Sequence, residues 1–543
     1  MFGQMQDWPL RVSTIIDHAA KYHGDRPVLG RSAEGPIVHS NWRGVRADAR
    51  KVSQALNAMG YGKNDAIGVM AWNTVRHMAV WYGVTGAGCI MHTLNPRLFA
   101  EQLDYIINHA DDRVIMVDAD IVGVLEPLLD KLTKVERWII LTDRANMPET
   151  SLPNAICYEE WIAEQTGDFD WIDGEERDPC GLCYTSGTTG NPKGVLYSHR
   201  SNVLHAMFSI APDCIGMSSN DVIMPVVPLF HANGWGMAYT APMVGASLVM
   251  PGRDMSPAGI YEMLDMGVTM SAAVPTVWLG LLQHLRAKKL RLDKVSRVVI
   301  GGSSCPRAVI EAFQNDYGVQ VIHAWGMTEC SPLGSVCTLK PEVMVLDAAG
   351  RLDMQTTVGH PPYGADLRIT DDNGDELPWD NKSQGKLWIR GPGVVKRYHN
   401  AEDVATVDGD WFDTGDVATM NAHAYVRITD RSKDVIKSGG EWISSIALEN
   451  AAVAHPLVAE AAAIGVPHEK WGERPILCVV GVDGARPPKD EVLAEVARHF
   501  AKWQIPDDVV YLDALPHTAT GKISKLELRK ILNAQGYTHP EAA

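Results

Sequence analysis

The sequence has no run of 18 consecutive apolar residues, so it predicts no transmembrane helix. Residues 1–11 lack a basic region followed by an apolar core, so we expect no signal peptide. Basic residues are in the minority: 49 Lys and Arg stand against 66 Asp and Glu, for a formal net charge of -17 at pH 7. Non-specific binding to nucleic acid or anionic lipid needs a basic face, so this balance argues against both partners.

The nine cysteines are scattered and odd in number, which favours a reducing, cytoplasmic location over a disulfide framework. Cys180 and Cys183 form a C-x-x-C pair, but no second pair or Cys/His partner stands at a zinc-like spacing. A redox or metal-binding role is the alternative. We favour two buried structural thiols, because both cysteines lie in an apolar run that is typical of a strand.

Internal repeats and low-complexity tracts are absent as well. The 543 residues are too many for one hydrophobic core, so we expect two or more domains. A hydrophobic content of 46% with 21% charged residues is typical of a soluble globular enzyme.

Residues 8–60 are predicted to form helices around a short hairpin. Beyond them, short β-prone runs alternate with helical patterns as far as residue 323, which indicates an α/β fold with parallel sheets covered by helices on both faces. The predicted strands are 66–71, 114–117, 138–141, 180–184, 222–227, 247–250, 269–274, 297–300 and 319–323. The predicted helices are 74–86, 101–109, 257–266, 276–285 and 307–317.

The pattern changes after about residue 350. Predicted strands at 367–370, 386–389 and 425–428 are separated by Gly, Asp and Asn turns, which favours an antiparallel, barrel-like subdomain. The last stretch of roughly 110 residues is long enough for an independent α+β domain. Its predicted helices are 445–454, 491–502 and 525–533, and its predicted strands are 458–464 and 476–482.

A loop rich in glycine and hydroxyl groups, Tyr184 to Gly194, follows one of the predicted strands. It holds three glycines, four Ser or Thr hydroxyls, one proline and Lys193. Glycines let the backbone turn and point several N–H groups inward, and a lysine can reach the outer phosphates of a nucleotide. The common phosphate loop, Gly-x-x-x-x-Gly-Lys-Ser/Thr, is absent, which excludes a P-loop kinase or ATPase. The alternative to a phosphate-binding loop is a flexible surface loop without a ligand.

This loop closely resembles the signature of adenylate-forming enzymes, which include acyl-CoA synthetases, luciferases and peptide-synthetase adenylation domains. Further motifs of that family follow in its order, so the resemblance covers nearly the whole chain. They are Pro228–His231, Gly301–Ser304, Trp325–Glu329, Asp413–Asp416, Arg431–Asp434, Lys437–Glu441 and Thr518–Lys522.

The resemblance implies ATP and Mg²⁺ as cofactors, with coenzyme A as co-substrate. It places Glu329 and Thr185 at the metal, Thr328 at the α-phosphate and Trp325 beside adenine, and it gives Asp416 and Arg431 to the ribose. An ordinary core tryptophan is the alternative for Trp325. The implied nucleotide and coenzyme A contacts as a set are Thr185, Ser186, Gly187, Thr188, Thr189, Gly190, Lys193, Gly302, Ser303, Trp325, Gly326, Met327, Asp416, Arg431, Lys433, Lys437, Gly439, Gly440 and Glu441.

The same resemblance names Lys522, Glu329, Thr328 and His231 as catalytic residues, with Lys522 bridging the carboxylate and the α-phosphate. A structural histidine is the alternative for His231. The implied acyl pocket consists of His231, Asn233, Gly234, Trp235, Gly302, Gly326 and Pro332, with Trp235 at the acyl tunnel.

The domains implied are a large N-terminal domain, residues 1–432, and a small mobile domain, residues 433–543, with a hinge at Lys433. Many relatives have Gly-Arg where this chain has Asp430-Arg431. Acetyl- and benzoyl-type ligases often carry aspartate at the hinge, so Lys433 is more similar to the luciferase and fatty-acyl branches.

The chain resembles bacterial medium- and long-chain fatty-acyl-CoA ligases and 3-methylmercaptopropionate–CoA ligases. We therefore expect an ATP-dependent carboxylate–CoA ligase, acting on 3-methylmercaptopropionate and short- or medium-chain fatty acids through an acyl-adenylate. The alternatives are a medium/long-chain fatty-acyl-CoA synthetase, a luciferase-like oxygenase or a catalytically dead acyl sensor. A peptide-synthetase domain is disfavoured, since no carrier domain follows. The expected partners are small molecules, with a homodimer as a further expectation.

Overall fold

The computed structural model describes residues 3–172, 174–185, 191–439, 441–517 and 523–537, apart from the side chain of Glu441. The chain packs into two compact units, in which Met1–Asp366 joins Ile389–Phe412, and Leu367–Trp388 joins Asp413–Ala543. Residues 389–412 thus return to the first unit after the chain has entered the second. Neither this division nor any other observation tests the predicted hinge at Lys433, which stays a prediction.

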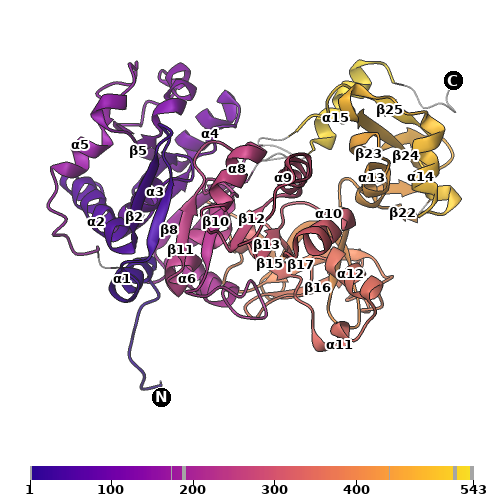
Figure 1. Ribbon diagram of the computed structural model, residues 1–543, viewed down its shortest axis with the longest axis horizontal. Helices are drawn as coiled ribbons and strands as arrows, with labels where there is room; N and C mark the ends of the chain where they lie inside the picture. Colours follow the sequence, from indigo (N-terminus) through magenta and orange to yellow (C-terminus); the bar gives the residue numbers. More distant parts are fainter. Residues whose placement is uncertain (1–2, 173, 186–190, 440, 518–522, 538–543) are drawn as a thin grey trace. The chain divides into compact units, whose positions relative to one another are not determined.

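The first unit contains a seven-stranded sheet with the order β7-β6-β5-β3-β4-β8-β9. Two of its strands, β5 and β8, are labelled in Figure 1. Its neighbours pair in parallel, except that β8 and β9 are antiparallel and enclose the glycine-rich loop. The strands are β3 (Ala66–Met70), β4 (Ile90–Thr93), β5 (Asp112–Val117), β6 (Arg137–Ile140), β7 (Ile156–Cys157), β8 (Pro179–Tyr184) and β9 (Gly194–Ser198). The helices in this part are α3 (Val75–Gly86), α4 (Ala100–Ala110) and α5 (Tyr158–Ala163).

An eight-stranded sheet, also in the first unit, has the order β15-β14-β13-β12-β10-β11-β1-β2. It is parallel from β1 to β14, with an antiparallel strand at each edge. Its strands are β1 (Pro27–Arg31), β2 (Ile37–Asn41), β10 (Val222–Pro225), β11 (Ser247–Met250), β12 (Met270–Ala273), β13 (Arg297–Ile300), β14 (Gln320–Gly326) and β15 (Leu333–Val336). The helices are α1 (Val12–Tyr22), α2 (Trp42–Ala58), α6 (His199–Ser209), α7 (Met237–Val244), α8 (Pro257–Leu264), α9 (Pro275–Lys288), α10 (Arg307–Glu311), α11 (Pro341–Met344) and α12 (Ala348–Thr356).

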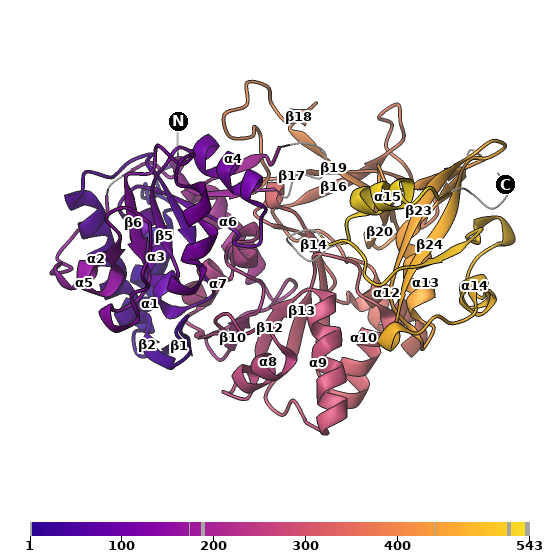
Figure 2. The same cartoon turned by 90° about the horizontal axis from the view of Figure 1, so that it is seen from above.

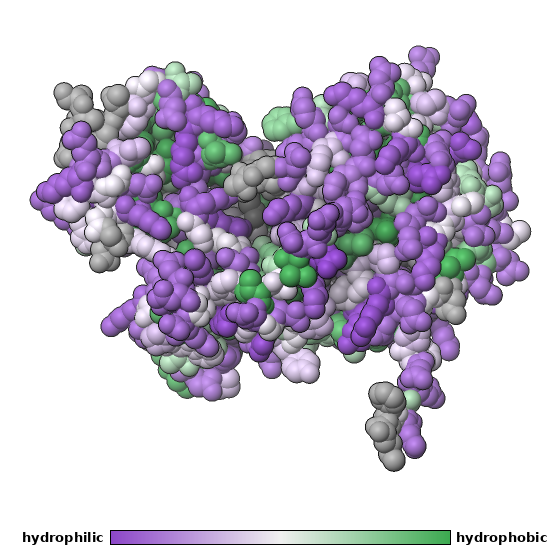
Figure 3. Space-filling view, turned by 180° about the vertical axis from the view of Figure 1, so that it is seen from behind, coloured by the Kyte–Doolittle hydropathy of each residue, from purple (hydrophilic) through white to green (hydrophobic). Residues whose placement is uncertain are grey.

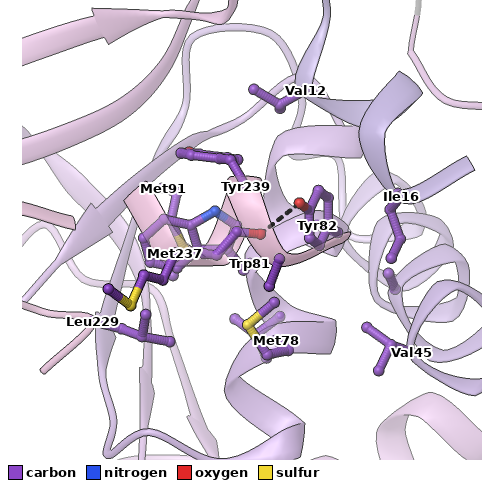
Figure 4. Close-up of a cluster of buried hydrophobic side chains, with 14 of the residues drawn as sticks. Val12, Ile16, Val45, Met78, Trp81, Tyr82, Met91, Leu229, Met237 and Tyr239 are labelled. Carbon is purple, nitrogen blue, oxygen red and sulfur yellow. Dashed lines mark hydrogen bonds between the residues drawn. The ribbon is translucent and has the colours of Figure 1, made fainter. Parts of the chain in front are cut away.

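Both faces of this sheet are covered, as the sequence predicts, because alternate strand residues enter different cores. Val298 and Ile300 of β13 pack with α8, α9 and α10, which lie along one face of the sheet in Figure 2. Val299 between them enters a second core, which α1, α2, α3 and α7 help to form. Figure 4 shows this second core, in which the buried Tyr82 hydroxyl donates a 2.7 Å hydrogen bond to the Ala238 carbonyl.

Most of a five-stranded sheet lies in the second unit. Its order is β16-β17-β19-β18, and β20 also pairs with β19. The pairs β18–β19 and β19–β20 are antiparallel, which agrees with the predicted change of pattern after residue 350. The strands are β16 (Asp366–Thr370), β17 (Gly385–Arg390), β18 (Thr406–Val407), β19 (Trp411–Met420) and β20 (Val426–Arg431).

The C-terminal sheet has the order β22-β21-β24-β23, with β25 parallel to β24. Its strands are β21 (Ile436–Ser438), β22 (Glu441–Ile443), β23 (Val458–His468), β24 (Gly472–Gly481) and β25 (Val509–Tyr511), and its helices are α13 (Ser445–Val453), α14 (Lys489–Ala497) and α15 (Lys525–Ala534). The helix predicted at 491–502 was placed too far along the chain. It ends at Ala497, and Ala501 is extended, with its N–H bonded to the Gln504 side chain, so that a separate 3₁₀ turn forms.

Cys180 and Cys183 are buried free thiols, as predicted. Burial raises the pKa of Cys180 to about 12, which leaves it an unreactive thiol at neutral pH. No helix in the described part of the chain is long and apolar enough to cross a membrane. Hydrophilic residues cover most of the face in Figure 3, where hydrophobic residues form separate patches.

Candidate active site

The glycine-rich loop connects β8 to β9, and its two ends are hydrogen-bonded to each other. Tyr184 pairs with Gly194 across the hairpin. The Thr185 N–H donates to the Lys193 carbonyl at 2.9 Å, and the Lys193 N–H donates to the Thr185 hydroxyl at 3.3 Å. These bonds fix where the loop begins and ends. The predicted phosphate contacts Ser186, Gly187, Thr188, Thr189 and Gly190 lie outside the described residues.

Lys193 and Glu329 are brought together by Tyr398, which sequence reasoning did not single out. The Lys193 Nζ lies 4.9 Å from the centre of the Tyr398 ring, and the Tyr398 hydroxyl donates to Glu329 Oε1 at 2.8 Å. Glu329 is only 7% exposed, and a carboxylate so buried needs such a partner. Burial, together with the charge of Glu329, raises the pKa of Tyr398, so the phenol keeps its proton and acts as a donor.

The loop after β14 carries Thr328 and Glu329 in a shape that permits no side chain at Gly326. A Cβ on Gly326 would lie 1.9 Å from the Pro332 carbonyl oxygen, which instead accepts the Met327 N–H at 2.9 Å. The buried Tyr197 hydroxyl donates to the Thr328 carbonyl at 2.6 Å. Met327, Thr328 and Glu329 are therefore held by the fold before any ligand binds.

Trp325 is the tryptophan predicted to lie beside adenine. It is 9% exposed, and a Cβ built on Gly334 would lie 2.3 Å from its ring. The indole thus packs closely against the backbone of Gly334 in β15. Contact between the ring and adenine stays a prediction, as does the role of Ser303.

Trp235 stands at the end of a backbone turn with left-handed dihedral angles. Ala232, Asn233 and Trp235 have φ of 37°, 44° and 53°, and Gly234 and Gly236 are also positive. Such angles cost a non-glycine residue about 1–2 kcal/mol, and strain of this kind is common at functional sites.

The turn places the Trp235 ring against Gly301 and against Gly302, of which Gly302 belongs to the predicted acyl pocket. A Cβ on Gly301 would lie 3.1 Å from the ring, and one on Gly302 would lie 3.8 Å from it. Trp235 therefore packs against the backbone of Gly301 and Gly302. That Trp235 and Gly302 form one wall of an acyl pocket stays a prediction.

The segment that leads into this turn is fixed by Asn73, which follows β3 and was not predicted. Its side-chain amide donates to the carbonyls of Pro225 and Val227 at 2.7 and 2.9 Å and accepts the Leu229 N–H at 2.8 Å. Asn73 is 1% exposed. A polar residue three positions beyond the end of a buried strand is the signal that could have identified it. His231, two residues beyond Leu229, is partly exposed.

Asn233 and His205 form the support behind the turn. The Asn233 carbonyl oxygen accepts the Thr93 hydroxyl at 3.2 Å, so its side chain faces β4 and is 6% exposed. His205 of α6 accepts the Leu333 N–H through Nε2 at 3.0 Å and lies against Gly236. Burial lowers the pKa of His205 to about 3, so this imidazole is neutral and serves as an acceptor.

In the second unit, Asp416 and Arg431 face each other across β19 and β20. The Arg431 Nε lies 2.8 Å from Asp416 Oδ1, and Asp416 is 2% exposed. Asp430 stands where many relatives have glycine. It accepts the Ser445 N–H at 2.6 Å, and so supports the first turn of α13.

The remaining predicted residues of this unit are described only in part. Lys437 Nζ lies 5.6 Å from the centre of the Trp442 ring. Gly439, with φ of +62°, donates its N–H to the Trp471 carbonyl at 2.8 Å. Burial lowers the pKa of Lys433. Gly440, the Glu441 side chain and Lys522 lie outside the described residues.

The donors available near Glu329 fit Mg²⁺. The described residues include no group of three or more His, Cys, Asp or Glu side chains able to hold a metal. Mg²⁺ usually takes one or two protein oxygens and completes its shell with phosphate and water. A Glu329 carboxylate and a Thr185 hydroxyl are ligands of that kind, so the residues present fit the ion.

The comparisons with known proteins identify the family. Residues 16–399 match the family described as AMP-binding enzyme, and residues 447–522 match the AMP-binding enzyme C-terminal domain. The chain belongs to the family of AMP-binding enzymes.

Three individual proteins show how close the likeness is. A 3-methylmercaptopropionyl-CoA ligase of Ruegeria pomeroyi is 47% identical, with 98% of both chains covered. A medium-chain-fatty-acid–CoA ligase of Ectopseudomonas oleovorans is 43% identical, with 98% of this chain and 97% of the relative covered. The crystal structure of an anthranilate CoA ligase in complex with anthranoyl-AMP superposes with a TM-score of 0.86 at 23% identity, covering 98% of this chain and all of the other. It confirms the fold.

Proposed function

We propose that the protein is an ATP-dependent, AMP-forming ligase that joins 3-methylmercaptopropionate or a short- to medium-chain fatty acid to coenzyme A. The observation that carries the proposal is the arrangement of Lys193, Tyr398 and Glu329, which sets a cation and a carboxylate beside the glycine-rich loop. The relatives named as CoA ligases support the reaction, and the 47% identical one supports the acid. They give no support to a luciferase-like reaction.

In the first half-reaction a carboxylate oxygen bonds to the α-phosphorus of ATP while the bond from that phosphorus to the bridging oxygen breaks and pyrophosphate leaves. Lys193 balances the phosphate charge, and Thr328 binds the α-phosphate. Thr185 and Glu329 would hold Mg²⁺, which would supply further positive charge on the phosphates. In the second half-reaction the thiol sulfur of coenzyme A bonds to the acyl carbon, AMP leaves, and the thiol proton passes to solvent. His231 lies at the acyl and thiol entry.

The small C-terminal domain carries two elements with different tasks. Lys522 bridges the carboxylate and the α-phosphate, whereas Lys437 and the residues up to Glu441 line the path of the pantetheine thiol. Because these two elements act in different half-reactions but belong to one small domain, residues 433–543 turn about Lys433 between the half-reactions. Asp416 and Arg431 bind the ribose, and Trp325 stacks on adenine.

The test is a panel of propionate, 3-methylmercaptopropionate, butyrate, octanoate and palmitate, each with ATP, Mg²⁺ and coenzyme A. We expect AMP and acyl-CoA in equal amounts, with the best kcat/KM on 3-methylmercaptopropionate or a neighbour of similar length. A preference for palmitate would show that the protein is a long-chain fatty-acyl-CoA ligase instead. Oxygen uptake, or ATP binding without AMP from any acid, would overturn the ligase proposal itself.

Two further proposals concern the state of the protein in the cell. Nine free, buried cysteines support a reducing, cytoplasmic location. A homodimer is proposed from the resemblance alone, and light scattering during size-exclusion chromatography would test it by giving twice the 59.4 kDa of one chain.

A further inference from the structure

Residues 393–400, which we call the strap, bond to both of the loops that carry the site. At one end the Val395 N–H donates to the Glu329 carbonyl at 2.7 Å. The Ser331 hydroxyl also donates to the Gly393 carbonyl, at 2.7 Å. The strap is therefore fixed to the loop that follows β14.

The other end of the strap is fixed to the base of the glycine-rich loop. The His399 N–H donates to the Gly194 carbonyl at 2.8 Å, and a Cβ on Gly194 would lie 3.1 Å from that of His399. The Asn400 amide donates to the His109 carbonyl of α4 at 3.0 Å. Two loops that come from different sheets are thus joined by one short segment of the first unit.

Tyr398 is the residue of the strap whose side chain touches both loops at functional groups. Its hydroxyl donates to the Glu329 carboxylate, and its ring lies under the Lys193 ammonium. The ring itself is steadied by an edge-on contact with Phe412, whose ring centre lies 6.4 Å away. A half-buried tyrosine satisfies both roles at once, because its hydroxyl is a donor to a carboxylate and its face attracts a cation.

We propose that Tyr398 is a positioning residue for the adenylation half-reaction, which sets the Glu329 carboxylate for Mg²⁺ and the Lys193 ammonium for the phosphates of ATP. The proposal rests on the function proposed above. Tyr398 contacts neither reacting atom in it. Its effect passes through Glu329 by the hydroxyl and through Lys193 by the ring, so the two contacts can be removed separately.

The experiment compares Tyr398→Phe, which keeps the ring and removes the hydroxyl, with Tyr398→Leu, which removes both. Tyr61→Phe is the matched control, because the Tyr61 hydroxyl donates to Glu136 at 2.9 Å in the same unit, far from these loops in the sequence. Binding of Mn²⁺–ATP is measured without any acid by electron paramagnetic resonance of the free ion. ATP–pyrophosphate exchange is measured over a range of Mg²⁺ concentrations, and melting temperatures are recorded for all variants.

For Tyr398→Phe we expect Mn²⁺–ATP affinity to fall about 10- to 150-fold, the range for one hydrogen bond to a charged group. The Mg²⁺ concentration for half-maximal exchange should rise by a similar factor, with the KM for the acid unchanged. Tyr398→Leu should also raise the KM for ATP. Thioester formation from preformed acyl-adenylate should stay within about twofold of the wild type in both variants.

The proposal would be overturned if the Tyr398 variants lost equal activity in both half-reactions. It would also be overturned if their losses of activity followed the drop in melting temperature in the way that Tyr61→Phe shows. Either result would mean that Tyr398 only supports the fold. Unchanged Mn²⁺–ATP affinity in folded Tyr398→Phe would also overturn the proposal. Failure of the wild-type protein to exchange pyrophosphate would refute the proposed function instead, and the binding experiment would still report on Tyr398, since it needs no turnover.

Discussion

Replacing Trp235 tests whether the left-handed turn exists to present an indole to the acyl chain. The ring lies against the backbone of Gly301 and Gly302, so removing it opens space beside these two glycines. Room for about three methylenes at about 0.8 kcal/mol each gives about 2.4 kcal/mol. We therefore expect Trp235→Ala to raise kcat/KM for octanoate over that for 3-methylmercaptopropionate by about 60-fold relative to the wild type.

Trp235→Gly separates this effect from backbone strain. Both variants remove the ring, but only glycine adopts a φ of 53° without a penalty. The two variants should share the same chain-length profile, whereas urea unfolding should find Trp235→Gly more stable than Trp235→Ala by about 1 kcal/mol. Competition assays with paired acids measure the profile directly. An unchanged preference in two folded variants would mean that Trp235 is packing alone, and equal stabilities would mean that the turn is not strained.

Three further predictions concern catalysis and acid stability. Glu329→Gln should lower the rate of ATP–pyrophosphate exchange by about 10²-fold or more and raise the Mg²⁺ requirement. A near-normal exchange rate at low Mg²⁺ would show that Glu329 is not a metal ligand. Lys522→Ala should slow adenylate formation about 10²–10⁴-fold but leave thioester formation from preformed adenylate substantial. Lys433→Pro should do the reverse. If Lys522→Ala slowed both half-reactions equally, the two-orientation mechanism would be contradicted. Burial holds the pKa of His205 near 3, whereas the unfolded chain protonates it near 6.5, so the contribution of His205 to stability is full above pH 6.5 and falls by about 1.4 kcal/mol per pH unit below it. His205→Gln should remove that slope in urea unfolding between pH 6 and 5, and an unaltered slope would show that His205 is not its source.

The sequence predicts the fold well where local pattern decides the structure. The alternation around Val298, Val299 and Ile300 follows from the period of a strand with two covered faces, and the β8–β9 loop follows from its glycines. The end of α14 was missed because the Ala501 N–H donates to the Gln504 side-chain oxygen instead of continuing the helix.

The site is predicted less completely, because its supports are ordinary residue types whose partners are distant in the sequence. Asn73 bonds to residues about 150 positions away, and Tyr398 joins residues about 70 and 200 positions away. Contacts between residues so far apart cannot be recognised from the local amino-acid composition. The Gly-Pro-Gly run at 391–393 indicates only a tight turn before the strap, not its partners.

The return of residues 389–412 to the first unit has a consequence for synthesis on the ribosome. The glycine-rich loop and the loop after β14 are both complete by residue 332, but the strap that joins them is made only when about three-quarters of the chain has been translated. Domains that fold during synthesis usually do so from the N-terminus onward. Here the first unit must wait, with its two loops unjoined, while part of the second unit is already outside the exit tunnel. Nascent chains stalled before residue 393 therefore lack the segment that joins the two loops, however well their sheets have formed.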